Sequence, residues 1–167
     1  SERAFAAVKK QVEFGPRPAG SAAIEAARKH IEETLLSHGW EVERQEFTDE
    51  TPRGRVKFMN VIARFAADGR RPVPRQTQAA VVCSHYDTKR YSTIQFVGAN
   101  DAGSSTGALL ELARVLALDP PLAAKVELVF FDGEEAVVQF SELDGLYGSR
   151  YYARKLREDR RAAQFRF

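Results

Sequence analysis

Five polar side chains near the middle of this chain have the types and spacing that a metal-dependent reaction requires. They are His85 and Asp87 after one apolar run, Asp101 between glycines, and the adjacent Glu134 and Glu135 after a second apolar run. Imidazole and carboxylate groups are the donors that proteins use for a borderline cation such as zinc. We therefore interpret these five residues as candidates for one metal site.

The positions within this set indicate different roles. Adjacent glutamates at an irregular strand end can point in different directions, so one can bind a metal while the other acts as acid or base. An aspartate two residues after a histidine, as Asp87 is after His85, can form a hydrogen bond to the ring or to another metal ligand without binding the metal itself. Glycines at positions 98 and 103 allow the backbone around Asp101 to bend closely about an ion.

Each group alone also has a structural explanation. The segment from His85 to Asp87 fits a turn, Asp101 fits an Asx turn or a helix N-cap, and paired glutamates are common on surfaces. A phosphate-binding loop over residues 98–107 is a further alternative. That segment lacks both the Gly-Lys-Ser/Thr ending and the glycine spacing of dinucleotide loops. The metal interpretation depends on all three groups following an apolar strand or a glycine-rich bend.

The elements that must position these residues are two apolar runs, at residues 79–84 and 126–131. Ligands in open α/β sheets bind beyond the carboxyl ends of such strands. Residues 41–47 and 57–65 are predicted to form an antiparallel pair around a turn at 51–54. The predicted fold is α/β, with a mixed, mostly parallel sheet, an antiparallel edge pair and flanking helices.

Helical periodicity and capping residues predict the helices. The predicted helices cover residues 4–14, 22–38 with Ser21 as N-cap and Gly39 after its end, a segment from Ser104 or Ser105 to Leu116, and 146–158. His30 and His38 are eight residues apart, which is not the one-turn spacing of a helical metal pair, so we assign them surface or packing roles. Cys83, the single cysteine, lies in an apolar run and is expected to be a small buried hydrophobe.

The composition excludes several classes of protein. The 167 residues suit one domain, and no apolar run is long enough to span a membrane. Arginines are dense toward the C-terminus, but no aromatic platform accompanies them, so we interpret them as a solvated helix face and expect no nucleic-acid partner. These arginines are Arg150, Arg154, Arg157, Arg160, Arg161 and Arg166.

Four short segments resemble those of a known enzyme family. They are GPRPAGS at residues 15–21, SHYDT at 84–88, GANDAG at 98–103 and FFDGEE at 130–135. Their order and spacing resemble the zinc aminopeptidase family of the M28 type. The long spacer between Glu135 and the Leu-Tyr-Gly-Ser segment at 146–149, and the run from His85 to Tyr91, resemble its glutaminyl cyclase branch more narrowly.

The resemblance implies that Asp101 and Glu135 bind zinc and that Glu134 is the general acid and base. In two-zinc relatives the equivalent of His85 binds the second metal, whereas in single-zinc cyclases it stays nearby without binding, so one zinc or two are implied. The resemblance also places Phe140 in the aromatic wall of the substrate pocket. It further implies a cis peptide bond between Asp101 and Ala102.

The same resemblance implies that the family fold continues past residue 167 and that a third zinc ligand, a histidine, lies in that later part. We therefore expect residues 1–167 to be a single zinc-hydrolase-like α/β domain that is incomplete at its C-terminus and inactive or impaired by itself. An incomplete sheet exposes an apolar edge, through which a homodimer could form.

The implied reaction converts the N-terminal glutamine of peptides or proteins to pyroglutamate and releases ammonia. An M28-type zinc aminopeptidase is the first alternative, and a non-catalytic fragment that associates through the exposed sheet edge is the second. The resemblance also suggests a secreted or periplasmic location.

Overall fold

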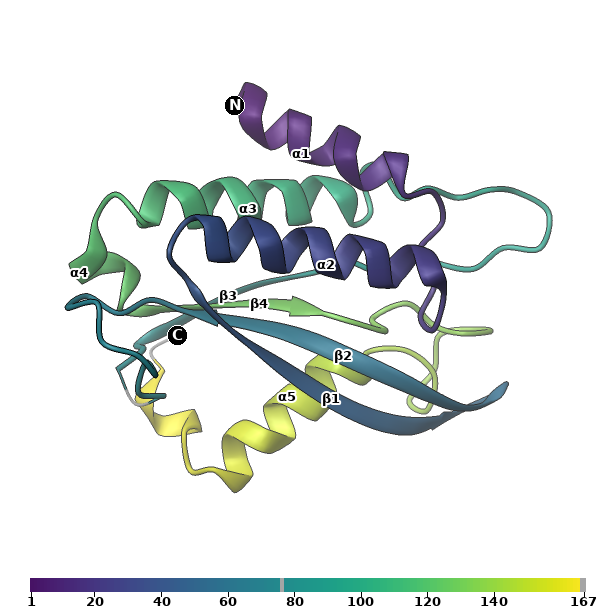
Figure 1. Cartoon of the computed structure of the whole chain (residues 1–167). Coiled ribbons are helices and arrows are strands. Elements are labelled where there is room, and N and C mark those ends of the chain that lie inside the picture. Colours follow the sequence, from purple (N-terminus) through teal and green to yellow (C-terminus); the bar gives the residue numbers. More distant parts are fainter. Residues whose placement is uncertain (76, 166–167) are drawn as a thin grey trace.

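The computed structural model describes residues 1–75 and 77–165, and it contains one four-stranded sheet flanked by helices (Figure 1). The elements are α1 (Glu2–Glu13), α2 (Ala22–Ser37), β1 (Glu41–Thr51), β2 (Gly54–Arg64), β3 (Ala80–His85), α3 (Gly103–Leu116), α4 (Pro120–Ala123), β4 (Val126–Phe131), α5 (Tyr147–Glu158) and a final 3₁₀ turn (Ala162–Gln164). Helices α2 and α3 cover one face of the sheet, α1 packs on α3 as an outer layer, and α5 lies on the opposite face (Figure 1).

The strand order β1-β2-β4-β3 confirms a mixed α/β sheet. Strands β1 and β2 form the predicted antiparallel pair, in register from Glu41 opposite Arg64 to Thr51 opposite Gly54. Strand β2 pairs antiparallel with β4, and only β3 and β4 are parallel among the described strands. Parallel pairing is thus less extensive than predicted. The short turn after β1 enforces an antiparallel neighbour, while the crossover through α3 allows a parallel one.

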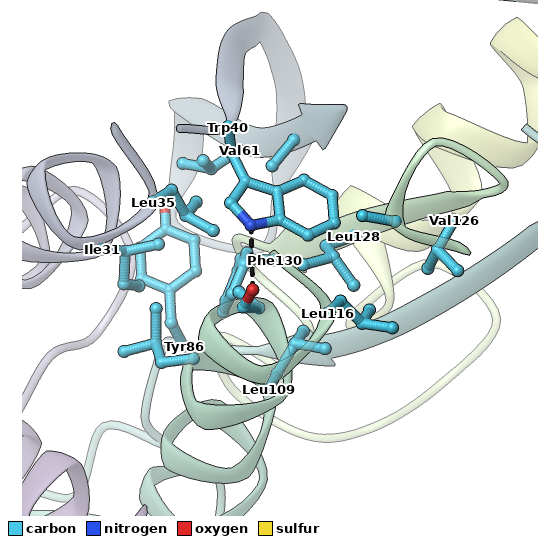
Figure 2. Packing of buried hydrophobic residues seen from close by; sticks show 14 of the residues in the cluster. Ile31, Leu35, Trp40, Val61, Tyr86, Leu109, Leu116, Val126, Leu128 and Phe130 are labelled. Carbon is cyan, nitrogen blue, oxygen red and sulfur yellow. Dashed lines mark hydrogen bonds between the residues drawn. The ribbon is translucent and has the colours of Figure 1, made fainter. Parts of the chain in front are cut away.

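The main core lies between β4 and the helices α2 and α3. All six residues of β4 are buried, its five apolar residues as predicted and Glu127 in ion pairs with Arg64 and Arg161. Trp40 is 1% exposed and its indole Nε1 donates a hydrogen bond to the carbonyl of Ala113 in α3, at 3.0 Å (Figure 2). Around the indole lie Ile31 and Leu35 from α2, Leu109 and Leu116 from α3, and Leu128 and Phe130 from β4. Each such buried side chain contributes about 1.5–3 kcal/mol relative to an exposed one.

Helix boundaries follow the sequence closely for α1, α2 and α5. Ser21 caps α2 by accepting a hydrogen bond from the N–H of Ile24 at 3.2 Å, and Gly39 adopts a positive φ of 84° just after the helix.

The predicted packing role of His30 is confirmed, because its ring lies 5.8 Å from that of Phe14. Arg166 lies outside the described residues. No helix in the described part of the chain is both long and apolar enough to cross a membrane.

Two local predictions are wrong. Neither Ser104 nor Ser105 caps α3, because that helix already begins at Gly103, after an N-cap residue without a side-chain capping bond. Cys83 is exposed rather than buried. Strand β3 is an edge strand of the described sheet, with a hydrogen-bonded neighbour on one side only, so an apolar sequence does not guarantee burial there. Val82 in the same strand is 37% exposed.

Candidate metal centre

The predicted site residues meet at the carboxyl ends of β3 and β4. His85 is the last residue of β3 and pairs in register with Phe131, the last residue of β4, so parallel pairing brings both strand ends to one edge. Glu135 follows β4, and Asp101 comes from the loop before α3. The potential donor atoms of His85, Asp101 and Glu135 all lie within 4.8 Å of one another.

The imidazole of His85 lies between two carboxylates. Its Nε2 is 3.0 Å from Oδ1 of Asp101, and its Nδ1 is 3.2 Å from Oδ1 of Asp87. Asp87 is fully buried and also accepts hydrogen bonds from the backbone N–H groups of Glu134, at 3.1 Å, and Glu135, at 3.0 Å. One buried carboxylate therefore orients the histidine ring and holds the loop that carries both glutamates.

The segment that carries Asp101 folds back over Gly98. The peptide bond between Asp101 and Ala102 is cis, which confirms the prediction. The N–H of Gly103 donates to the carbonyl of Gly98 at 2.9 Å. A Cβ atom at Gly98 would lie 2.2 Å from the carbonyl oxygen of Asp101, and its φ is +54°, so only glycine fits this position without displacement.

Glu134 is fixed by Ser149, a contact that the sequence does not reveal. Its Oε1 accepts from the backbone N–H of Ser149 and its Oε2 accepts from the Ser149 hydroxyl, both at 2.7 Å. Ser149 lies in the first turn of α5, where backbone N–H groups have no partner within the helix and a carboxylate is favourable. Burial raises the pKa of Glu134 more than these hydrogen bonds lower it. The only sequence signal is the serine in the Leu-Tyr-Gly-Ser helix start.

The electrostatics of the cluster favour a bound cation. Burial alone would lower the pKa of His85, but the hydrogen bond that its ring donates to Asp87 and the negative charges of Asp87, Asp101 and Glu135 raise that pKa to about 9. Burial, followed by repulsion from Asp87 and Asp101, raises the pKa of Glu135. Three carboxylates around one imidazole thus carry an excess of negative charge.

The donor set fits zinc. Zinc-bound nitrogen and oxygen donors lie about 2.0–2.2 Å from the ion, so donor atoms as close as those of His85, Asp101 and Glu135 need only small side-chain movements to share one. The buried Asp87 on the far nitrogen of His85 is the kind of outer partner that zinc-bound histidines have.

Phe140 lies on the loop that follows the glutamates, with its side chain 65% exposed. The loop is held by Asp144, which accepts hydrogen bonds from the N–H groups of Val137 at 2.7 Å, Val138 at 2.8 Å and Gln139 at 2.9 Å. The role of Asp144 is invisible in the sequence, where it is one acidic residue in a polar stretch. The Phe140 ring lies beside Gly145, because a Cβ atom added at Gly145 would come within 2.9 Å of Cδ2 of Phe140 and 3.4 Å of the Glu134 carbonyl oxygen.

Two hollows lie on this side of the molecule. A cavity of about 180 Å³ is lined by Asp87 and Glu135 together with Thr88, Ala136 and Arg90, among others. A larger one, of about 590 Å³, lies between the tip of the β1–β2 hairpin and α5 and contains none of the predicted site residues. Of these two cavities, only the smaller one is lined by residues of the acidic cluster.

Comparison with known proteins identifies the family. The model of the family described as Peptidase family M28 matches residues 60–167, which include all five candidate residues. The chain belongs to peptidase family M28. This confirms the resemblance inferred from the four short segments.

Within family M28, the chain is similar to glutaminyl cyclases. It is 37% identical over 153 residues to a glutaminyl-peptide cyclotransferase of Boiga irregularis, covering 82% of this chain and 40% of the relative. A glutaminyl cyclase structure from an Acidobacteriales bacterium superposes with a TM-score of 0.84 at 31% identity, covering 98% of this chain and 55% of that one.

A zinc-dependent enzyme with a different named activity also matches. The structure of a Zn-dependent exopeptidase from Parabacteroides distasonis superposes with a TM-score of 0.76 at 29% identity, covering 91% of this chain and 55% of that one. The chain spans about two fifths of the length of the curated relatives it matches and just over half of these structures.

Proposed function

We propose that the full-length protein is a glutaminyl-peptide cyclotransferase, which converts N-terminal glutamine of peptides or proteins to pyroglutamate and releases ammonia. The observation that carries this proposal is that the donor atoms of His85, Asp101 and Glu135 lie close together, next to Glu134, whose carboxylate is held by Ser149. The chain that contains this cluster is similar to glutaminyl-peptide cyclotransferases. The names of those relatives describe glutaminyl peptides as their substrates, and we propose the same substrate class for this protein.

Asp101 and Glu135 are the proposed zinc ligands. With two ions His85 would bind the second one, and with a single ion it would stay beside the site without binding; in both cases Asp87 orients its ring. Bound zinc supplies a positive charge that polarises the γ-carboxamide carbonyl of the substrate. The number of ions is one or two, and metal analysis of the purified protein decides between them.

Glu134 carries the proton in the proposed reaction. The α-amine of the substrate forms a bond to the carboxamide carbon and loses a proton, which Glu134 accepts and then gives to the departing ammonia. Ser149 holds the carboxylate in place during both transfers. Because nucleophile and carbonyl belong to one glutamine residue, folding the substrate into a reactive conformation is a large part of the catalysis. Phe140 is proposed to form an aromatic wall of the substrate pocket.

An aminopeptidase reaction is the second candidate, and the similarity to the Parabacteroides exopeptidase favours it. In that reaction Glu134 would instead take a proton from water that attacks the first peptide bond. Both reactions use the same residues, so the geometry of the cluster does not separate them.

Two substrates given to full-length protein separate the candidates. A Gln-initiated peptide is expected to release ammonia without free amino acid, and an aminoacyl reporter is expected to stay intact. Release of amino acid without ammonia would contradict cyclisation. Glu134→Gln should remove activity with zinc retained, whereas Glu135→Ala should lose zinc.

Two further features of the protein are proposed. Association through the sheet edge rests on β3, the edge strand with Val82 and Cys83 exposed, and light scattering of the 167-residue chain tests it. Secretion or periplasmic location rests on the family resemblance, and fractionation of the producing cells tests it.

A further inference from the structure

Arg17 is a charged residue buried where no role has been assigned to it. It lies in the Gly-Pro-Arg-Pro turn between α1 and α2 and is 0% exposed. Charged side chains are almost never fully buried unless they are paired. Among the described residues, no carboxylate forms an ion pair with Arg17, and its guanidinium donates only to backbone carbonyl groups.

Those carbonyls come from three separate segments. The Nη1 atom donates to Gln11 at 2.7 Å and to Gly15 at 2.9 Å, both near the end of α1. It also donates to Val97 at 2.9 Å, while Nε donates to Tyr86 at 3.2 Å. The guanidinium therefore joins the two ends of the loop between β3 and α3 and anchors them to the end of α1.

The backbone of Arg17 strengthens the same anchor. Its N–H donates to the hydroxyl of Thr88 at 2.8 Å, and its carbonyl accepts from the N–H of Thr88 at 3.1 Å. Residues 90–95, farther along the loop, are exposed, and the loop projects beyond the helices (Figure 1). The buried part of the loop is thus its base, at the point where Arg17 binds.

The base of this loop sets the distance between two candidate ligands. Tyr86 directly follows His85, and Val97 directly precedes Gly98, over which the Asp101 segment is folded. Closing a flexible loop has an entropic cost, which a fixed base reduces for the contact between His85 and Asp101. The positive charge of Arg17 also lies near the negative charge of Asp87, whose attraction raises the pKa of Arg17 against the larger lowering effect of burial.

We propose that Arg17 is a positioning residue of the metal centre, which holds Asp101 opposite His85 by clamping both ends of the loop between them. This inference rests on the proposed zinc site. Arg17 does not touch the site itself, and it acts through the carbonyls of Tyr86 and Val97. Its fork of donors is essential, because a single ammonium group cannot reach carbonyls of three segments in the same way.

Conservative variants of the full-length protein test the proposal. Arg17→Lys keeps the charge and loses the fork, whereas Arg17→Met loses both. The matched control is Arg161→Lys, because Arg161 is also buried, at 5% exposed, but binds Glu127 at the opposite end of β4. Zinc affinity is measured by competition with a chelator, and hydrogen–deuterium exchange is measured over residues 97–103 of the metal-free protein.

We expect Arg17→Lys and Arg17→Met to weaken zinc binding roughly 10- to 100-fold, the range typical of partners behind metal ligands. Exchange over residues 97–103 should accelerate in both. Arg161→Lys is expected to lower the melting temperature and leave zinc affinity and this exchange unchanged. If Arg17→Met does not fold, Arg17→Lys alone decides the matter.

Wild-type zinc affinity in a folded Arg17 variant would overturn the proposal, as would an equal loss in Arg161→Lys. A wild-type protein that binds no zinc would instead overturn the zinc site. The exchange measurement on metal-free protein would then still show whether Arg17 clamps the loop.

Discussion

Both carboxylate oxygens of Glu134 are occupied by Ser149, one by its backbone N–H and one by its hydroxyl, each at 2.7 Å. The proposed proton carrier is therefore held at the start of α5 rather than by the metal ligands. Removing the hydroxyl frees one oxygen and lets the carboxylate rotate.

Ser149→Ala is expected to lower kcat about tenfold or more and to change KM little, because a hydrogen bond to a charged group is worth about 1.5–3 kcal/mol. Steady-state kinetics with a Gln-initiated peptide measure this, with zinc content determined in parallel. Ser37→Ala, at an exposed helix position, is the control and should behave as wild type. Unchanged kcat in Ser149→Ala would mean that the backbone N–H alone positions Glu134.

Asp144 should make the free energy of unfolding depend on pH in the acidic range. Burial alone would raise its pKa, but the hydrogen bonds from Val138 and Val137, the Tyr147 hydroxyl and Gln139 outweigh burial and lower the pKa below its ordinary value. A carboxyl with a lowered folded-state pKa stabilises the fold above its unfolded pKa of about 3.9, and this contribution is lost as pH falls through the folded value.

Asp144→Asn should therefore be less stable than wild type near neutral pH, and the difference should shrink as the pH is lowered below about 4. Urea unfolding at a series of pH values measures it. Asp49→Asn, at an exposed strand position, is the control. A stability difference that does not depend on pH would show that Asp144 acts through its shape and not its charge.

Metal binding should stabilise the folded protein by mass action. Zinc at about one hundred times its dissociation constant adds about 2.7 kcal/mol to the free energy of unfolding. Chelator should therefore lower the melting temperature of wild type and of Glu134→Gln equally, and should have little effect on Glu135→Ala. A chelator effect of wild-type size in Glu135→Ala would remove Glu135 from the ligand set.

Gly98→Ala tests the close approach of the Asp101 segment. A Cβ at this position would meet the carbonyl oxygen of Asp101 at 2.2 Å and Cγ2 of Thr88 at 2.6 Å. Gly69→Ala is a matched control, because Gly69 also has a positive φ, +71°, but nothing lies within 4 Å of its added Cβ.

Both alanine variants should lose about 1–2 kcal/mol of unfolding free energy for the left-handed backbone. Only Gly98→Ala should lose more than that and also bind zinc more weakly. Denaturant unfolding and chelator competition measure the two effects. Equal behaviour of the two variants would show that the backbone near Asp101 yields without moving the carboxylate.

The sequence predicts most of the elements and the cluster because both depend on local patterns. The apolar run of β4 and the periodic helices are short-range signals, and side chains after parallel strands must share one edge. The sequence does not predict the roles of Ser149, Asp144 and Arg17. Each of these residues binds backbone or side-chain groups that come close only in the folded chain. The prediction that Cys83 is buried is wrong for a related reason, because an apolar run does not reveal that its strand lies at the edge of the sheet.

Trp40 gives this molecule an optical reporter. It is the single tryptophan of these 167 residues, and its indole is buried with its N–H bonded to the carbonyl of Ala113 in α3. The emission wavelength of an indole changes when water reaches it, so intrinsic fluorescence of this chain follows the docking of α3 on the sheet. Because the Asp101 segment leads directly into α3, the same signal records without any label how far disturbance of the metal centre spreads into the core.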